Sequence, residues 1–273
     1  MRRLMLSLVA VSVAQSALAA DYGEPVLRGS QSYYVPGNPV YYRWDGVYFG
    51  GQVGGVYGRG DFGGGVGSLV SNILRNTTIE SEAQVSSWTT LSKADVSGVS
   101  YGAFAGYNAQ WENAVLGFEI NYNHTDQNVE ARDSIARSFT TSDGYFYNVN
   151  VTGSALVRVK DYGTIRARAG WVFDNIMPYG FVGLALMRSD VVRSANVNLT
   201  ATQVGFPDLA LNQTQAVTST DVVSYGWALG LGADWAILPN LFLRAEYEYI
   251  NFGDVKDVKL QMQTARLGVG VKF

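Results

Sequence analysis

The chain contains no cysteine and only one histidine, and charged residues make up just 16% of its 273 residues. The absence of cysteine excludes a disulfide scaffold. A formal net charge of -3 has the wrong sign for a basic nucleic-acid-binding surface, so no nucleic-acid partner is expected. Beyond the N-terminus, no apolar run approaches the ~20 residues of a membrane-spanning helix. Intrinsic disorder is also excluded, because 47% of the residues are hydrophobic and 13% are aromatic.

Residues 1–20 have the layout of an export signal. Arg2 and Arg3 precede an apolar stretch at 4–13, and small residues follow at 17–19. This order predicts a secretory signal peptide cut after Ala19 or Ala20, whereas a short buried helix would give no reason for the arginines. Residues 21–45 are rich in proline and tyrosine and show no regular period, which indicates an extended N-terminal segment.

Alternation of apolar and polar side chains with a period of two occurs eight times between residues 46 and 273. Each run spans about 10 to 13 residues, the length that a tilted strand needs to cross a bilayer. The predicted strands are 46–57, 99–110, 114–123, 161–173, 178–188, 223–236, 241–250 and 262–273.

The connections between these strands alternate in length. Short turns at 111–113, 174–177 and 237–240 alternate with long polar loops at 58–98, 124–160, 189–222 and 251–261. Short turns at one end and long loops at the other are typical of outer-membrane barrels. We therefore predict an all-β fold for 46–273, an eight-stranded antiparallel transmembrane β-barrel with long extracellular loops, preceded by a periplasmic segment at 21–45.

Glycine on the polar face of the strands indicates which face lies inside. Along 262–273, one face carries Ala265, Leu267, Val269, Val271 and Phe273, and the other carries Thr264, Arg266, Gly268, Gly270 and Lys272. Glycine has little purpose on a solvated face but makes room in a narrow lumen, so we place the polar face inside. A soluble β-sandwich or soluble barrel is the alternative fold, because alternation alone does not fix which face is wet.

The strands then bring four residues of each charge into the lumen. These are Glu119, Asp234, Glu246 and Glu248 with Arg166, Arg168, Arg244 and Arg266. A charge in such an interior is costly unless it is paired, so the equal numbers predict an ionic network. Because eight strands leave an interior that side chains just fill, the network is expected to plug the lumen, with a small or gated leak as the alternative.

Aromatic residues are expected to form two belts at the levels of the lipid headgroups. The belt at the short turns comprises Trp111, Trp171, Phe173, Trp235 and Phe273, and the belt near the long loops comprises Tyr57, Tyr101, Tyr122, Tyr225, Trp227, Tyr247 and Tyr249. Strand 178–188 fits least well. If Val182 and Leu184 face lipid, Tyr179 and Phe181 must point inward.

The segment Trp44 to Gly51, followed by Gly54 and Gly55, resembles the first strand of small alphaproteobacterial outer-membrane β-barrel proteins. Residues 102–110, 177–180 and 267–273 resemble later strands of that family, so the resemblance covers about 46–273. Members are described as porin-like, and some as haemin-binding. The resemblance implies that Phe273 is an assembly signal for the barrel-assembly machinery. It also raises haem as an optional cofactor, for which His124, Tyr145 and Tyr147 are available ligands.

No enzyme is expected, since the chain has neither Gly-x-Ser-x-Gly nor His-Glu-x-x-His and no cysteine. No metal site is expected either. The leading expectation is an exported protein of the Gram-negative outer membrane with a structural and surface-interaction role. Its partners would be outer-membrane lipid and lipopolysaccharide, together with surface ligands or host factors that no motif names. The alternative is a porin-like barrel, or one that takes up haem or another small ligand.

Overall fold

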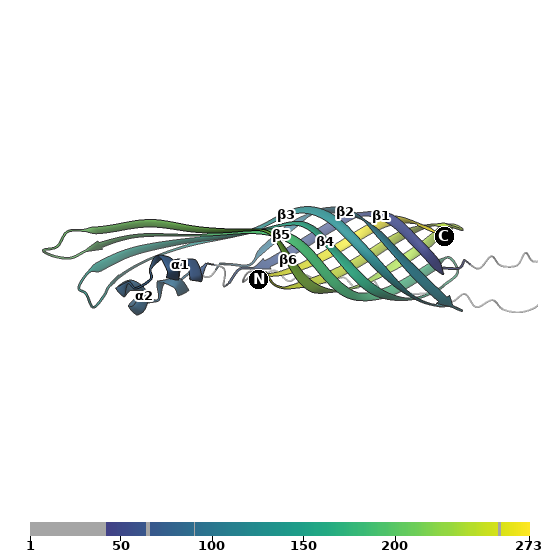
Figure 1. Cartoon of the computed structure of the whole chain (residues 1–273), viewed down its shortest axis with the longest axis horizontal. Coiled ribbons are helices and arrows are strands. Elements are labelled where there is room, and N and C mark those ends of the chain that lie inside the picture. Colours follow the sequence, from purple (N-terminus) through teal and green to yellow (C-terminus); the bar gives the residue numbers. More distant parts are fainter. Residues whose placement is uncertain (1–41, 64–65, 90, 256–257) are drawn as a thin grey trace, which may run out of the picture. The chain divides into compact units, whose positions relative to one another are not determined.

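The structure, a computed structural model, describes residues 42–63, 66–89, 91–255 and 258–273. The expected signal peptide at 1–20 and most of the expected periplasmic segment lie outside the described residues. The strands are β1 (Gly46–Asp61), β2 (Ala94–Trp111), β3 (Ala114–Thr140), β4 (Phe146–Trp171), β5 (Ile176–Thr202), β6 (Leu209–Leu238), β7 (Leu241–Val255) and β8 (Val258–Lys272). Each pairs antiparallel with its sequence neighbour, and β1 pairs with β8 to close the barrel (Figure 1). The prediction of eight antiparallel strands in a ring is confirmed.

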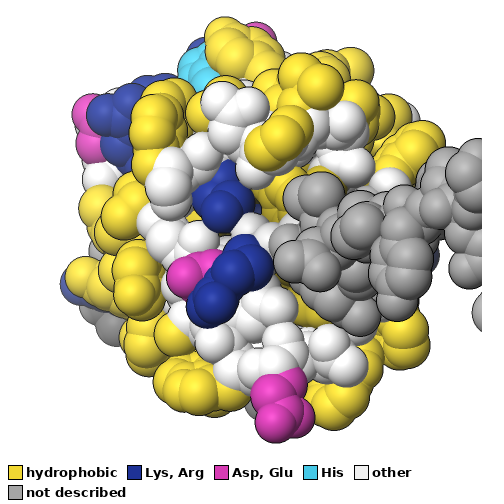
Figure 2. All heavy atoms as spheres, turned by 90° about the vertical axis from the view of Figure 1, so that its right-hand side faces the viewer, with side chains coloured by type: hydrophobic (Ala, Val, Ile, Leu, Met, Phe, Trp, Pro, Cys, Tyr) yellow, Lys and Arg dark blue, Asp and Glu magenta, His cyan; other side chains and the backbone are white. Residues whose placement is uncertain are grey.

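The barrel is apolar outside and charged inside. On β3, Leu116, Phe118 and Ile120 are 53–72% exposed, whereas Glu119 between them is 2% exposed. Figure 2 looks onto the end of the barrel that carries the C-terminus and shows hydrophobic side chains around most of its rim. A barrel that turns its apolar face outward is matched to lipid. The soluble alternative is therefore wrong.

The aromatic residues expected at the belts also face outward. Trp111, Trp171, Phe173, Trp235 and Phe273 are all more than half exposed beside the short turns. At the other end Tyr101, Tyr122, Tyr225 and Tyr247 are at least half exposed, while Tyr57 and Trp227 are somewhat less exposed and Tyr249 is half-buried. The ring positions fit the two headgroup levels of a bilayer.

The predicted outer ends of four strands are wrong, because β3, β4, β5 and β6 continue far into the expected loops 124–160 and 189–222. Their continuations pair with one another at 127–140, 146–159, 191–202 and 209–219, and we call this four-stranded sheet the extension (Figure 1). The alternation persists there: Val149 and Val151 are buried, and Asn148 and Asn150 are exposed. Serine, threonine and asparagine mark loops in many sequences, but here they occupy the water-facing positions of a sheet.

The expected loop 58–98 folds over the inner face of the extension. It contains α1 (Gly67–Ile73), α2 (Thr78–Ala83) and η1 (Val85–Ser87). Buried side chains of this segment, including Val70, Leu74 and Trp88, share one apolar core with Val151 and Val197 of the extension. No helix in the described part of the chain has the length and hydrophobicity needed to cross a membrane.

A line of register shifts separates the extension from the barrel. The shifts fall between His124 and Gln127 on β3, between Val159 and Asp161 on β4, and between Ser189 and Val191 on β5. Bulges of this kind bend strands and are frequent at barrel rims. They mark the level at which β3 to β6 leave the closed barrel.

Candidate functional site

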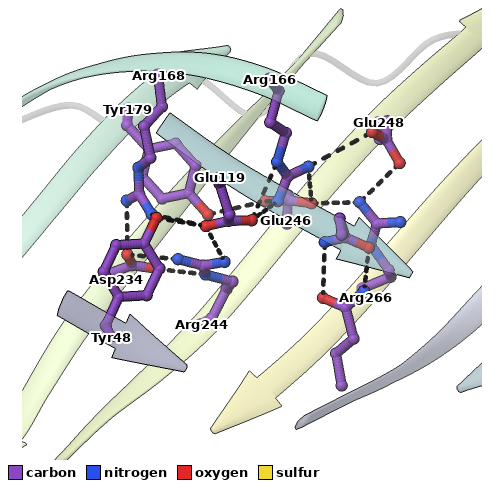
Figure 3. Close-up of polar contacts among 12 residues, drawn as sticks. Tyr48, Glu119, Arg166, Arg168, Tyr179, Asp234, Arg244, Glu246, Glu248 and Arg266 are labelled. Carbon is purple, nitrogen blue, oxygen red and sulfur yellow. Dashed lines mark hydrogen bonds and ion pairs between the residues drawn. The ribbon is translucent and has the colours of Figure 1, made fainter. Parts of the chain in front are cut away.

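The lumen holds one cluster built from all eight charged residues singled out in the sequence (Figure 3). Glu119 comes from β3, Arg166 and Arg168 from β4, Asp234 from β6, Arg244, Glu246 and Glu248 from β7, and Arg266 from β8. Each is at most 5% exposed. The four arginines and four acids balance in formal charge, as a buried network requires.

Glu119 lies at the centre of the network. Its Oε1 accepts from Arg166, whose Nε lies at 3.0 Å, and its Oε2 accepts from Arg168 at 3.1 Å and Arg244 at 2.8 Å. The hydroxyl of Tyr48 donates to the same Oε2 at 2.7 Å. One carboxylate therefore joins β1, β3, β4 and β7 across the barrel.

Two further carboxylates complete the network toward its ends. Asp234 accepts two hydrogen bonds from Arg244, at 2.8 and 3.0 Å, and one from Arg168 at 2.6 Å. Glu246 accepts from Arg166 at 2.8 and 2.7 Å and from Arg266. Paired arginine–carboxylate contacts of this kind fix geometry as well as charge.

The last pair is less completely satisfied. Oε2 of Glu248 lies 2.7 Å from Nη2 of Arg266, but the two do not form a well-oriented hydrogen bond. Within the described residues, Nε and Nη1 of Arg266 and the hydroxyl of Thr264 also have no hydrogen-bond partner. Buried polar atoms of this kind are places where water is held in a protein interior.

Aromatic side chains that the sequence did not assign to the network cover its arginines. The guanidinium carbon of Arg168 lies 3.8 Å from the ring centre of Tyr179, that of Arg166 lies 4.1 Å from Phe181, and that of Arg244 lies 4.0 Å from Phe104. Contacts between a cation and an aromatic face strengthen when both are desolvated. The inward turn of Tyr179 and Phe181, which made strand 178–188 hard to place, is thus explained.

Glycine makes the room that these large side chains need. A Cβ built on Gly230 would lie 2.3 Å from the ring of Phe181, and one on Gly232 would lie 2.5 Å from the ring of Tyr179. A Cβ on Gly183 would lie 2.7 Å from Cβ of Arg166. The glycines of the lumen therefore accommodate aromatic rings as well as charged side chains.

Apolar layers lie on both sides of the network. Toward the short turns, Trp44, Tyr48, Phe104 and Phe242 belong to one buried cluster, and the rings of Trp44 and Phe242 are 5.9 Å apart. Toward the extension, buried residues such as Met187, Phe252 and Met262 join the core that continues into the extension. The network is thus enclosed by packed side chains at both ends.

The residues considered for haem do not meet. His124 lies on β3 at the barrel rim, where its Nδ1 is 2.8 Å from Asp161. Tyr147 pairs with Phe139, which is fifteen residues further along β3, so at ~3.3 Å per residue the two sites are roughly 50 Å apart. Tyr145 and Tyr147 are neighbours, with ring centres 6.1 Å apart, and the Tyr147 hydroxyl donates to Asp143.

Phe273 lies on the outer face at the short turns. It is 72% exposed, its ring stacks on Phe49 with centres 5.4 Å apart, and its backbone N–H donates to the carbonyl of Val47. The terminal residue is thereby held in line with the closing pair of strands, β1 and β8.

Comparisons with known proteins give the family. The 31 kDa outer-membrane immunogenic protein of Brucella melitensis is 30% identical over 284 residues, covering 100% of both chains. The 25 kDa outer-membrane immunogenic protein of Brucella ovis is 26% identical over 63% of this chain and 62% of that protein. A solved structure, Ail of Yersinia pestis, aligns with 84% of this chain and 99% of its own at 14% identity and a TM-score of 0.32. The family model described as outer membrane protein beta-barrel domain matches residues 5–273, and the chain belongs to that family of the Gram-negative outer membrane.

Proposed function

We propose that this outer-membrane protein is a structural barrel that presents the extension at the cell surface and does not conduct. The observation that supports this most is the filled lumen. The ionic network is buried, it is neutral as a whole, and packed apolar side chains lie at both of its ends. A solute crossing the barrel would have to part ion pairs in a medium where separated charges are costly.

The extension has the properties of an independent interaction surface. The apolar core that continues into it from the barrel lies beneath α1 and α2, so the extension holds its shape outside the membrane. Its outward face is formed largely by small uncharged side chains, in rows such as Ser134, Thr152, Asn196 and Thr214 across its four strands. Asn196 donates to Asn212 at 2.9 Å and to Thr214 at 2.8 Å, which orders this face.

The two edges of the extension differ. Along 209–219, β6 carries no charged residue and pairs only with β5, since pairing with β7 starts at Gly226 among the described residues. The opposite edge on β3 carries Glu130, Arg132, Asp133 and Arg137. Charge on an edge strand opposes the addition of another strand, and an uncharged edge permits it. We place surface interactions of the strand-addition kind at β6.

The names of the relatives fit this proposal. Both Brucella proteins are called outer-membrane immunogenic proteins, and we infer that the extension is the part of this chain that antibodies and surface partners meet. Membrane lipid and lipopolysaccharide surround the barrel in this proposal, and Phe273 serves the assembly machinery. We propose no catalytic role, since the hydrogen-bond and ring contacts of His124 within the described residues are Asp161 and Tyr101.

Two measurements on the same preparation test the proposal. The purified barrel in planar bilayers is expected to give no steady conductance. Protease added to intact cells is expected to cut within the extension and leave the barrel strands intact. A steady, large conductance would contradict the closed lumen, and an extension that intact cells protect from protease would contradict surface display.

A further inference from the structure

A groove of about 470 Å³ crosses the outer face of the barrel below the register shifts. Its floor is Gly163 on β4, which lacks a side chain between Tyr122 on β3 and Leu186 on β5. Ile120, Ile165 and Val223 extend its apolar walls. Because this face of the barrel is turned to lipid, the groove is exposed to lipid acyl chains.

The upper end of the groove carries polar side chains from three strands. Asp161 accepts hydrogen bonds from Arg188, at 3.1 and 2.5 Å, and from the Tyr122 hydroxyl at 2.8 Å. Nδ1 of His124 lies 2.8 Å from the same carboxylate. On β3, His124 lies two residues beyond Tyr122 of the aromatic belt. On β6, Val223, which pairs with Arg188, lies two residues from Tyr225 of the same belt. These polar side chains are therefore at the level of the headgroups.

Among these polar side chains, Arg188 keeps a hydrogen-bond donor for an anionic ligand. The side chain of Arg188 is 54% exposed, and within the described residues its Nη1 makes no hydrogen bond. The side chain of His124 is 44% exposed, and its Nε2 is likewise without a partner among the described residues. The nearby acid Asp190 is paired with Lys160 at 2.8 Å. Asp221, 3.9 Å from Nε of Arg188, and the exposed Asp126, two residues beyond His124 on β3, are further acids at this level.

The groove at Gly163 is not distinguished by its size from other grooves on the outer face of the barrel. A larger groove of about 910 Å³ on the opposite strands is lined by Val53, Gly55, Val99, Tyr247 and Leu267. The charged residues that contribute to its wall, Glu246 and Arg266, are buried in the lumen network. The groove at Gly163 therefore combines an apolar channel with a half-exposed guanidinium at headgroup level.

We propose that the groove at Gly163 binds one phosphate-bearing lipid of the outer leaflet, with an acyl chain along Gly163 and the phosphate on Arg188. Guanidinium groups bind phosphate through charged, directional hydrogen bonds. Because the groove faces the membrane, a lipid is the molecule that can fill it. The positive charge of Arg188 at its upper end favours an anionic headgroup.

Native mass spectrometry of the barrel in an uncharged detergent tests this, with lipid A as the phosphorylated probe and diacylglycerol as the uncharged probe. The wild-type protein is expected to retain one lipid A in preference to diacylglycerol. Arg188→Gln keeps a donor for Asp161 but removes the charge, and is expected to weaken lipid A retention roughly tenfold. Val223→Trp narrows the groove and should reduce retention of both lipids.

Arg59→Ala is the matched control. Arg59 also pairs with a carboxylate, Asp95, and contacts a tyrosine hydroxyl, but it lines neither of the two grooves. Its loss should leave lipid A retention unchanged, and excess inorganic phosphate should not displace the lipid. Equal loss in Arg59→Ala and Arg188→Gln, unchanged retention in Arg188→Gln, or equal retention of the two lipids by the wild type would each overturn the proposal. Heat-modifiable gel mobility verifies that every variant is folded. If Arg188→Gln does not fold, Val223→Trp is the test, and unchanged lipid retention in that variant would overturn the proposal.

Discussion

Replacing Glu119 by glutamine removes one negative charge from the centre of the lumen while keeping the size of the side chain. Glu119 binds Arg166, Arg168 and Arg244, so the network would then hold four arginines against three acids. Breaking a buried ion pair by removing one partner costs about 3–5 kcal/mol. Each of the three arginines keeps another carboxylate, Glu246 or Asp234, so we expect the lower end, about 3 kcal/mol.

Urea unfolding in lipid vesicles, followed by tryptophan fluorescence, measures this free energy of unfolding. Glu130→Gln is the matched control, because Glu130 pairs with Arg132 on the exposed face of the extension, and it should change stability by less than about 0.5 kcal/mol. Adding Arg168→Gln to Glu119→Gln restores equal numbers of charges, so the double variant should lose about 1–3 kcal/mol less than the sum of the single variants. A loss below about 1 kcal/mol for Glu119→Gln, with additive effects in the double variant, would refute a tightly paired network.

Three further predictions concern the extension and the C-terminus. Val151→Asp places a carboxylate in the core under α1, and protease should cut the extension faster than in the wild type while the barrel keeps its heat-modifiable gel mobility; loss of that mobility as well would show that extension and barrel fold as one unit. The hydrogen bond from the Thr141 hydroxyl, aided by the Tyr145 N–H, holds the pKa of Asp143 below its ordinary 3.8. The turn at 141–145 is therefore stabilised above pH 3.8 and loses that contribution as the pH falls through the lowered value, which an NMR titration should show as a step below 3.8 that is absent in Asp143→Asn. Deleting Phe273 should lower the amount of folded protein in the outer membrane, whereas Phe49→Ala, which removes only its stacking neighbour, should not; equal effects would assign the role to packing.

The closed barrel and the residues of its lumen could be predicted because lipid and lumen impose opposite demands on alternate positions. Glu119 lies between Phe118 and Ile120. When these two apolar side chains face lipid, the charge of Glu119 must point into the lumen. The ion-pair partners of each charged residue could not be predicted from the sequence, because they depend on strand register. Tyr179 and Phe181 were placed in the lumen by parity alone, but their stacking on arginines needed coordinates.

The extension could not be recognised because its composition imitates loops. In the membrane a strand must be apolar on its outer face, so polar residues at 124–160 and 189–222 indicated that the strands had ended. In water the same alternation continues with serine, threonine and asparagine outside and valine inside, as at Asn150 and Val151. The α2 helix did leave a local signal, since Thr77 caps it by accepting from the N–H of Glu80.

The rim cluster at the groove was missed for a different reason. Tyr122 and His124 on β3, Asp161 on β4 and Arg188 on β5 are brought together only by the pairing of these strands beside the register shifts. The spacing of these four residues along the chain does not reveal how the strands are offset where they pair.

Because the chain lacks cysteine, single cysteines placed on either face of β6 test the central claim directly. Leu231 is 70% exposed on the outer face, and Ala228 is fully buried in the lumen. In lipid vesicles, Leu231→Cys should react with a membrane-soluble maleimide and its label should be quenched by spin-labelled lipid, whereas Ala228→Cys should resist both membrane-soluble and aqueous maleimides. Rapid reaction of Ala228→Cys with the aqueous reagent, or a label at position 231 that only aqueous quenchers reach, would contradict a lipid-facing barrel with a closed, charged lumen.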